Sequence, residues 1–98
     1  MNKYETTKWK KKREKILRRD KYQCQESKRY GRMVQADTVH HIFPVEEYPE
    51  YMFEDWNLIS LSAAQHNAMH DRDTHRLSAK GRELMERTAK RVSPPPRA

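Results

Sequence analysis

Four of the five histidines in this 98-residue chain lie between positions 40 and 70, and their spacing restricts how that segment can fold. His40 and His41 are adjacent in VHHI (residues 39–42), which predicts a short strand that Pro44 terminates, because proline cannot donate to a sheet ladder. Side chains alternate along a strand, so the two imidazole rings should point in opposite directions. His66 and His70 are four residues apart, and a helix would place both rings on one face.

The sequence around these histidines predicts a hairpin followed by a helix. The segment NLISLS (residues 57–62) alternates apolar side chains with serines, which is typical of a strand with one buried side. The intervening segment, EEYPEYMFEDW (residues 46–56), is acidic and aromatic and contains Pro49, so we expect a surface loop. Ser62 and Gln65 have the spacing of a capping box, in which each side chain bonds a free backbone N–H, and we expect a helix over 63–72.

Two further helices are predicted on either side of this segment. Residues 7–19 are basic and rich in helix formers, and they carry a narrow apolar stripe. The stripe consists of Trp9, Arg13, Ile16 and Leu17. Residues 78–91 predict a second helix, with Gly81 tolerated inside it. Its apolar side is formed by Leu77, Leu84, Met85 and Val92.

The segment around Cys24 looks like a loop or short ribbon. The tail at 93–98, SPPPRA, is expected to be disordered.

The charge of the chain favours an acidic partner. There are 21 Lys and Arg against 14 Asp and Glu, giving a net charge of +7, and nucleic acid is the first candidate because basic surfaces neutralise phosphates. A charged surface that only keeps the protein soluble would explain much of the same excess.

The single cysteine excludes a disulfide framework within one chain and is typical of an intracellular protein. Without an apolar run of about 20 residues or a signal peptide, we expect a cytoplasmic protein with no membrane partner.

The histidine pattern favours a metal site. A pair at i and i+4 commonly presents two imidazoles to one ion, although the same spacing also occurs on solvated helix faces. If His40 turns toward the helix, it supplies a third ligand, and His41 on the other side is free to accept a proton. Three nitrogen ligands favour a single divalent transition metal such as Zn, Ni, Mn or Co, with Mg possible.

The order HH at 40–41, Asn57 in WNLISL, then His66 and His70 resembles that of the HNH endonucleases. The segment that leads into the first histidines is similar to small stand-alone HNH proteins of bacteriophages and Gram-positive bacteria. The resemblance covers about residues 8–75. It implies an α+β fold with a ββα-metal (His-Me finger) core at about 36–75, formed by a two-stranded hairpin and a metal-binding helix. The helices at 7–19 and 78–91 would flank that core in a single domain spanning residues 1–92.

The resemblance also implies a role for each of these residues. His41 would be the general base that activates water, and Asn57 would hold the loop carrying His41 by bonding its backbone. His40, His66 and His70 would bind the metal ion, with His40 at a position where many members have aspartate. The implied reaction is hydrolysis of a DNA phosphodiester to 5′-phosphate and 3′-hydroxyl ends. A monomer would nick one strand, and a double-strand break would need two sites, as in a homodimer.

Basic residues near this core are expected to contact DNA phosphates without reading the base sequence. They are Lys8, Lys10, Lys11, Lys12, Arg18, Arg19, Lys28, Arg29 and Arg32.

The sequence departs from many HNH relatives where those carry two CxxC pairs that hold a structural zinc. Here the corresponding positions are Cys24 with Ser27 and Ser62 with Gln65, so three of the four thiolates are missing. We therefore expect no structural zinc, and local hydrogen bonds in its place at the start of the helix. Because metal ligands must be neutral, activity should fall as the pH drops through about 6.

Two other functions are compatible with the sequence. One is a catalytically silent DNA-binding module whose metal ion is structural. The other is a component of a larger assembly, such as one for phage DNA packaging, in which partner proteins supply specificity. Cleavage assays on a His41→Ala variant distinguish a nuclease from a silent module.

Overall fold

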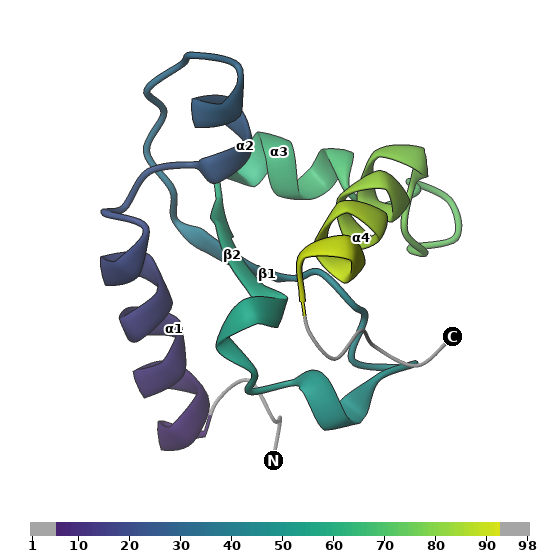
Figure 1. Cartoon of the computed structure of the whole chain (residues 1–98), viewed down its shortest axis with the longest axis horizontal. Helices are drawn as coiled ribbons and strands as arrows, with labels where there is room; N and C mark the ends of the chain where they lie inside the picture. The colour runs from purple at the N-terminus through teal and green to yellow at the C-terminus, as the bar shows by residue number, and fades with distance from the viewer. Residues whose placement is uncertain (1–5, 93–98) are drawn as a thin grey trace.

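The computed structural model describes residues 6–92, and the predicted disordered tail at 93–98 lies outside them. At its centre β1 (Thr38–His41) and β2 (Leu58–Leu61) form a two-stranded antiparallel sheet, in which His40 is opposite Ile59 and His41 is opposite Leu58. Figure 1 shows this hairpin between α1 (Thr7–Arg19) and α4 (Ala79–Arg91), with α3 (Ala63–Ala68) across one end. The predicted strands are confirmed, although the first begins and ends one residue earlier than expected and the second is one residue shorter at each end.

The N-terminal helix α1 has the bounds that its sequence predicts. Thr6 caps it, since the Thr6 hydroxyl oxygen accepts a hydrogen bond of 3.1 Å from the Trp9 N–H, and such caps satisfy free backbone donors. Trp9, Ile16 and Leu17 are buried in the core, as the apolar stripe indicates. The fourth stripe member, Arg13, is only partly buried, and its guanidinium donates to the Asp37 carbonyl at 2.6 Å. This bond joins α1 to the residue before β1.

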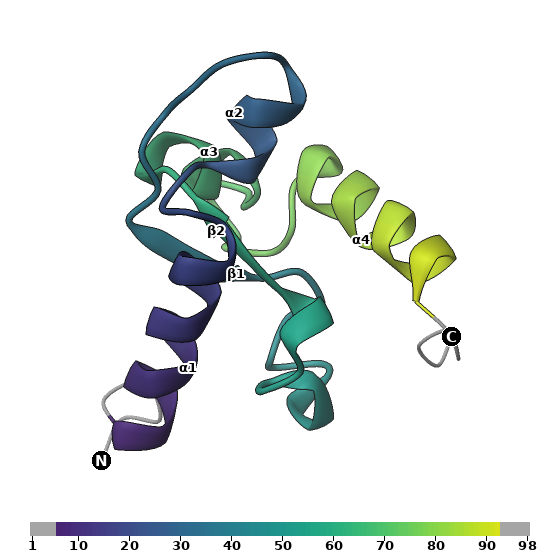
Figure 2. The same cartoon turned by 60° about the vertical axis from the view of Figure 1, so that its left-hand side comes forward.

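A short helix that the sequence did not reveal follows α1. The segment around Cys24 contains α2 (Gln25–Arg29), and Figure 2 shows the long loop that returns from it to β1. The helix ends at Arg29, and two residues later Gly31 has φ of +79°, a conformation that costs glycine little because it has no Cβ atom. A helix of five residues is too short to show the repeating apolar pattern from which helices are predicted.

The predicted helix over 63–72 is too long, because α3 ends at Ala68. Asp71 competes for the backbone beyond that point: its carboxylate accepts hydrogen bonds from the N–H groups of Asp73 and Thr74. The Asp71 N–H bonds the Arg76 carbonyl at 2.6 Å, which closes a tight turn with His75 in the left-handed region. As a result His70 lies just past the helix and pairs with Leu77 in an isolated bridge.

The C-terminal helix α4 packs closely against the end of α3. The Ser78 hydroxyl accepts from the Gly81 N–H and donates to the Ala68 carbonyl at 2.6 Å, so one side chain joins the two helices. A Cβ atom at Gly81 would lie 2.3 Å from the Met69 carbonyl oxygen. Glycine is therefore required here by the close approach of the two segments, rather than merely tolerated.

The segment between the strands is more ordered than a surface loop. It contains two 3-10 turns, η2 (Pro49–Tyr51) and η3 (Asp55–Asn57), and Met52 is buried. Aromatic rings pack edge to face within the segment, with Phe43 in contact with Tyr48, Tyr51 and Trp56. The acidic side chains reach solvent, whereas the aromatic side chains pack on the same hydrophobic core as the hairpin. Within residues 6–92 no helix is both long and apolar enough to cross a bilayer.

Candidate metal centre and active site

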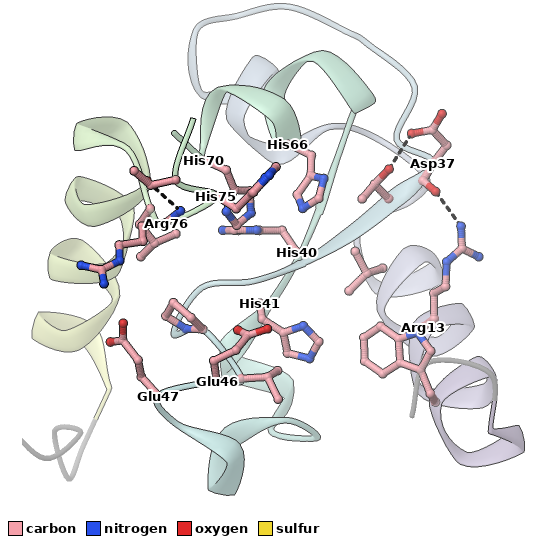
Figure 3. A pocket seen from close by; sticks show the side chains of 17 residues that line it. Arg13, Asp37, His40, His41, Glu46, Glu47, His66, His70, His75 and Arg76 are labelled. Carbon is pink, nitrogen blue, oxygen red and sulfur yellow. Dashed lines mark hydrogen bonds between the residues drawn. The ribbon is translucent and has the colours of Figure 1, made fainter. Parts of the chain in front are cut away.

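His40, His66 and His70 meet at one point although they come from three different parts of the fold. His40 lies on β1, His66 on α3, and His70 just beyond the end of α3. Their ring centroids are 5.0 to 5.3 Å apart, and one ring nitrogen from each lies within 4.8 Å of the other two. Figure 3 shows the three rings directed toward a common centre.

The donor atoms at this centre fit a divalent metal ion. The Nε2 atom of His40 is buried and has no hydrogen-bond partner, although buried polar atoms are nearly always paired. Burial, followed by the neighbouring His66 and His70, lowers the pKa of His40 to about 3. Burial also lowers the pKa of His66. These two imidazoles are thus kept in the neutral form that binds metals.

His41 points away from this centre, as strand alternation requires, yet it borders the same cavity. Its Nε2 atom lies 3.1 Å from the Met52 carbonyl oxygen. A carbonyl can only accept a hydrogen bond, so Nε2 carries the hydrogen and the lone pair of the neutral ring is on Nδ1. One face of the ring is covered by the indole of Trp9, with ring centroids 4.9 Å apart and planes 23° from parallel.

Asn57 is fully buried and bonds the backbone at both ends of the segment that follows β1. Its Oδ1 accepts from the Phe43 N–H at 2.7 Å, and its Nδ2 donates to the carbonyls of Phe43 and Tyr51. The backbone carbonyl of Asn57 also accepts from the Ile42 N–H at 2.8 Å. The bonds to Ile42 and Phe43 hold the chain immediately after His41, and the bond to Tyr51 holds a later part of the same segment.

The cavity that contains the histidines has a volume of about 940 Å³ and a mixed charge. Figure 3 shows Arg13 and Arg76 on opposite sides of the histidine cluster, with Glu46 and Glu47 along a third side. Sequence reasoning missed Arg76, which lies in an irregular turn with no pattern, and placed Trp9 and Arg13 in a stripe directed at the core. His75, the fifth histidine, also borders the cavity and is exposed.

The basic residues expected to contact DNA have different surroundings. Lys12 bonds Asp55 at 2.6 Å, and this bond, with one from Lys15, holds the pKa of Asp55 below its usual range. Arg19 bonds Asp20 and two carbonyls. Ion pairs also join Arg18 to Glu14 and Arg29 to Glu26, and the ammonium group of Lys8 lies 4.1 Å from the centre of the Phe53 ring. The remaining members of the set are all exposed: Lys10, Lys11, Lys28 and Arg32.

Cys24, Ser27 and Ser62 come together at the positions where many relatives have zinc ligands. The Ser27 hydroxyl lies 3.3 Å from the Cys24 sulfur. Burial alone would raise the pKa of the Cys24 thiol, but hydrogen bonds from Ser27 and Ser62 lower it below its ordinary value. The capping box is only half formed: Ser62 accepts from the Gln65 N–H, whereas the Gln65 side chain accepts from Lys80.

A hairpin and a helix that present three imidazoles to one point, with a fourth beside them, define the ββα-metal class of fold. No protein-family model matches the chain, and no curated protein matches its sequence. Among solved structures it is similar to the HNH endonuclease of the deep-sea thermophilic bacteriophage GVE2, crystallised with a manganese ion. The TM-score is 0.64 at 31% sequence identity, over 65% of this chain and 70% of the other. The chain belongs to the HNH endonuclease family, and the predicted α+β fold is confirmed.

Proposed function

We propose that this protein is a divalent-metal-dependent endonuclease that hydrolyses DNA phosphodiester bonds and nicks one strand per event as a monomer. The observation that carries the proposal is the position of His41 in the same cavity as the cluster of His40, His66 and His70. Hydrolysis of a phosphodiester needs a base for water and positive charge beside the phosphate, and the cavity provides for both. Two copies of the chain would be needed for a double-strand break.

The residues have separate tasks in the proposed reaction. The Nδ1 lone pair of His41 takes a proton from a water molecule, whose oxygen attacks phosphorus as the bond to the 3′ oxygen breaks. The 3′ oxygen then takes a proton from solvent, and His41 returns its own proton to solvent. His40, His66 and His70 would hold a divalent ion, and such an ion would supply positive charge beside the phosphoryl and departing oxygens. Manganese is one suitable ion, since the similar phage endonuclease was crystallised with it.

Asn57 acts through the backbone in this proposal. Its bonds to Phe43 and Tyr51 fix the loop that starts next to His41 and that includes Met52, the hydrogen-bond acceptor of His41. Phosphates on either side of the scissile one would be bound by exposed basic groups. The basic residues expected from the sequence remain candidates for this role: Lys8, Lys10, Lys11, Lys12, Arg18, Arg19, Lys28, Arg29 and Arg32. Arg13 and Arg76 are added because they border the cavity.

A plasmid-nicking assay tests the proposal directly. Wild-type protein with saturating Mn²⁺, Ni²⁺, Zn²⁺ or Mg²⁺ should convert supercoiled plasmid to the open-circular form, and chelation with EDTA should stop the reaction. His41→Ala should lower the rate by about 100-fold or more, since general-base catalysis contributes about that factor. His75→Asn is the matched control, because asparagine tolerates the left-handed backbone at this position, and it should leave the rate within a few-fold of wild type.

Two outcomes would contradict the proposal. If His41→Ala cuts at the wild-type rate while EDTA still abolishes cleavage, the base is another group. If the protein binds DNA but does not cut it with any of the four metals, it is a silent DNA-binding module.

A further inference from the structure

The indole ring of Trp9 is placed where it can control the orientation of His41. The two rings stack with centroids 4.9 Å apart and planes 23° from parallel. Trp9 is 5% exposed, so the contact is shielded from water. The indole also meets the ring of Phe53, with 6.3 Å between centroids and an edge-to-face arrangement. Trp9 therefore contacts both the imidazole and a second aromatic ring.

The helix that carries Trp9 is itself attached to the chain on both sides of His41. Arg13, one turn further on, donates to the Asp37 carbonyl just before β1. Lys12 and Lys15 bond the Asp55 carboxylate in the segment that leads into β2. The Thr6 cap fixes the backbone of Trp9 at the start of the helix. These contacts leave the indole little freedom to move relative to the hairpin.

Two of the contacts of His41 act in different directions. The hydrogen bond from Nε2 to the Met52 carbonyl holds one atom in the plane of the imidazole, but this bond does not by itself set the rotation of the ring about it. A stacked indole opposes this rotation, because turning the imidazole out of parallel would drive its edge into the buried ring. Together they fix the direction of the Nδ1 lone pair.

We propose that Trp9 is a positioning residue for His41. The inference rests on the proposed function, in which His41 is the base. If Trp9 only positions His41, its loss should change the rate of the hydrolytic step and leave the affinities for metal and DNA unchanged. A misplacement of about 1 Å can cost about 100-fold in rate, so loss of the stacking ring should be visible.

The test compares single-turnover nicking rates of Trp9→Leu and Trp9→Phe at saturating Mn²⁺. Trp9→Leu keeps an apolar side chain but removes the stacking ring, and we expect a rate 10- to 100-fold below wild type, an order-of-magnitude range. Trp9→Phe restores a ring, and its rate should lie within about threefold of wild type. The affinities for Mn²⁺, by titration calorimetry, and for DNA in EDTA, by gel shift, should be unchanged in both variants.

Ile16→Ala is the matched control, because Ile16 is fully buried on the same helix but is not in the cavity. It should lower stability and leave the rate at wild-type level under folding conditions. The proposal is wrong if Trp9→Leu cuts as fast as wild type, if Trp9→Phe is as slow as Trp9→Leu, or if Ile16→Ala loses rate to the same extent. It is also wrong if the Trp9→Leu rate falls in proportion to its DNA or metal affinity.

A measurement on the wild-type protein covers the case in which Trp9→Leu does not fold. The ring protons of His41, assigned by their absence in His41→Ala, should be shifted upfield in the proton NMR spectrum by the ring current of the indole. Ordinary chemical shifts for these protons would show that the rings do not stack and would overturn the proposal. If His41→Ala cuts normally, by contrast, the proposed function fails, whatever Trp9 does.

Discussion

His40 is the residue whose environment differs most from that of an imidazole in water. It is 1% exposed, and its pKa is lowered from 6.5 to about 3 by burial and by the neighbouring imidazoles. The unfolded chain therefore binds more protons than the metal-free folded protein between about pH 6.5 and pH 3. Stability must fall as the pH decreases through that window and must be retained above it.

The pH dependence gives a prediction for the metal-free protein. Between pH 7 and pH 4 the free energy of unfolding should decrease by about 3 kcal/mol on account of His40, at about 1.36 kcal/mol for each pH unit within the window. Urea unfolding in EDTA at several pH values measures it. His40→Leu, which has no proton to bind, should show a flatter dependence. An equally steep slope in that variant would assign the effect to other groups.

At the scale of the element, the close contact between α3 and α4 carries a second prediction. Replacing glycine by alanine inside a helix normally stabilises it by about 1 kcal/mol. At Gly81 the new methyl group would lie 2.3 Å from the Met69 carbonyl oxygen, so α4 must move away. Gly81→Ala should therefore lower the free energy of unfolding, by about 1 to 3 kcal/mol as for other overpacked sites.

Thermal and urea unfolding measure the effect of Gly81→Ala, with Glu86→Ala at an exposed site of α4 as the control. Nicking should weaken as well, because Met69 is next to His70, a proposed metal ligand. A Gly81→Ala protein more stable than wild type would show that the two segments are not in close contact.

The elements also show which parts of the fold the sequence predicts. Helix α1 and both strands can be predicted because the pattern of apolar residues within each segment is enough to indicate it. The end of α3 cannot be predicted in this way, because it depends on hydrogen bonds from the backbone to the Asp71 side chain. The rings of His66 and His70 still face the same point although the helix is shorter than predicted. The reason is that the N–H groups of Met69 and His70 bond carbonyls three residues back, which continues the helical turn. The stacking of Trp9 on His41 joins positions 32 residues apart, and no local pattern encodes it.

For the whole molecule, a small core makes a bound metal a significant part of stability. Chains of this size bury a limited apolar surface, and any ligand that binds only the folded state adds stability. At a free Mn²⁺ concentration 100 times its dissociation constant the gain is about 2.7 kcal/mol. For a chain of this length it should raise the melting temperature by about 10 °C or more.

Melting curves with and without Mn²⁺ and Zn²⁺ test this expectation. His66→Ala and His70→Ala should lose the shift because each removes one of the three proposed ligands. His75→Asn should keep it. A shift that survives in His66→Ala would place the stabilising ion elsewhere in the protein.

The pairing of β1 with β2 has a consequence for chemistry as well as for shape. His40 and His41 are the same residue type, and only the face of the sheet to which each belongs makes one a proposed ligand and the other a proposed base. A slip of β1 by a single position against β2 would exchange their sides. Asn57 opposes such a slip, since its backbone bonds Ile42 and its side chain bonds Phe43 across the end of the hairpin. A buried amide thus decides which of two identical neighbours performs which task.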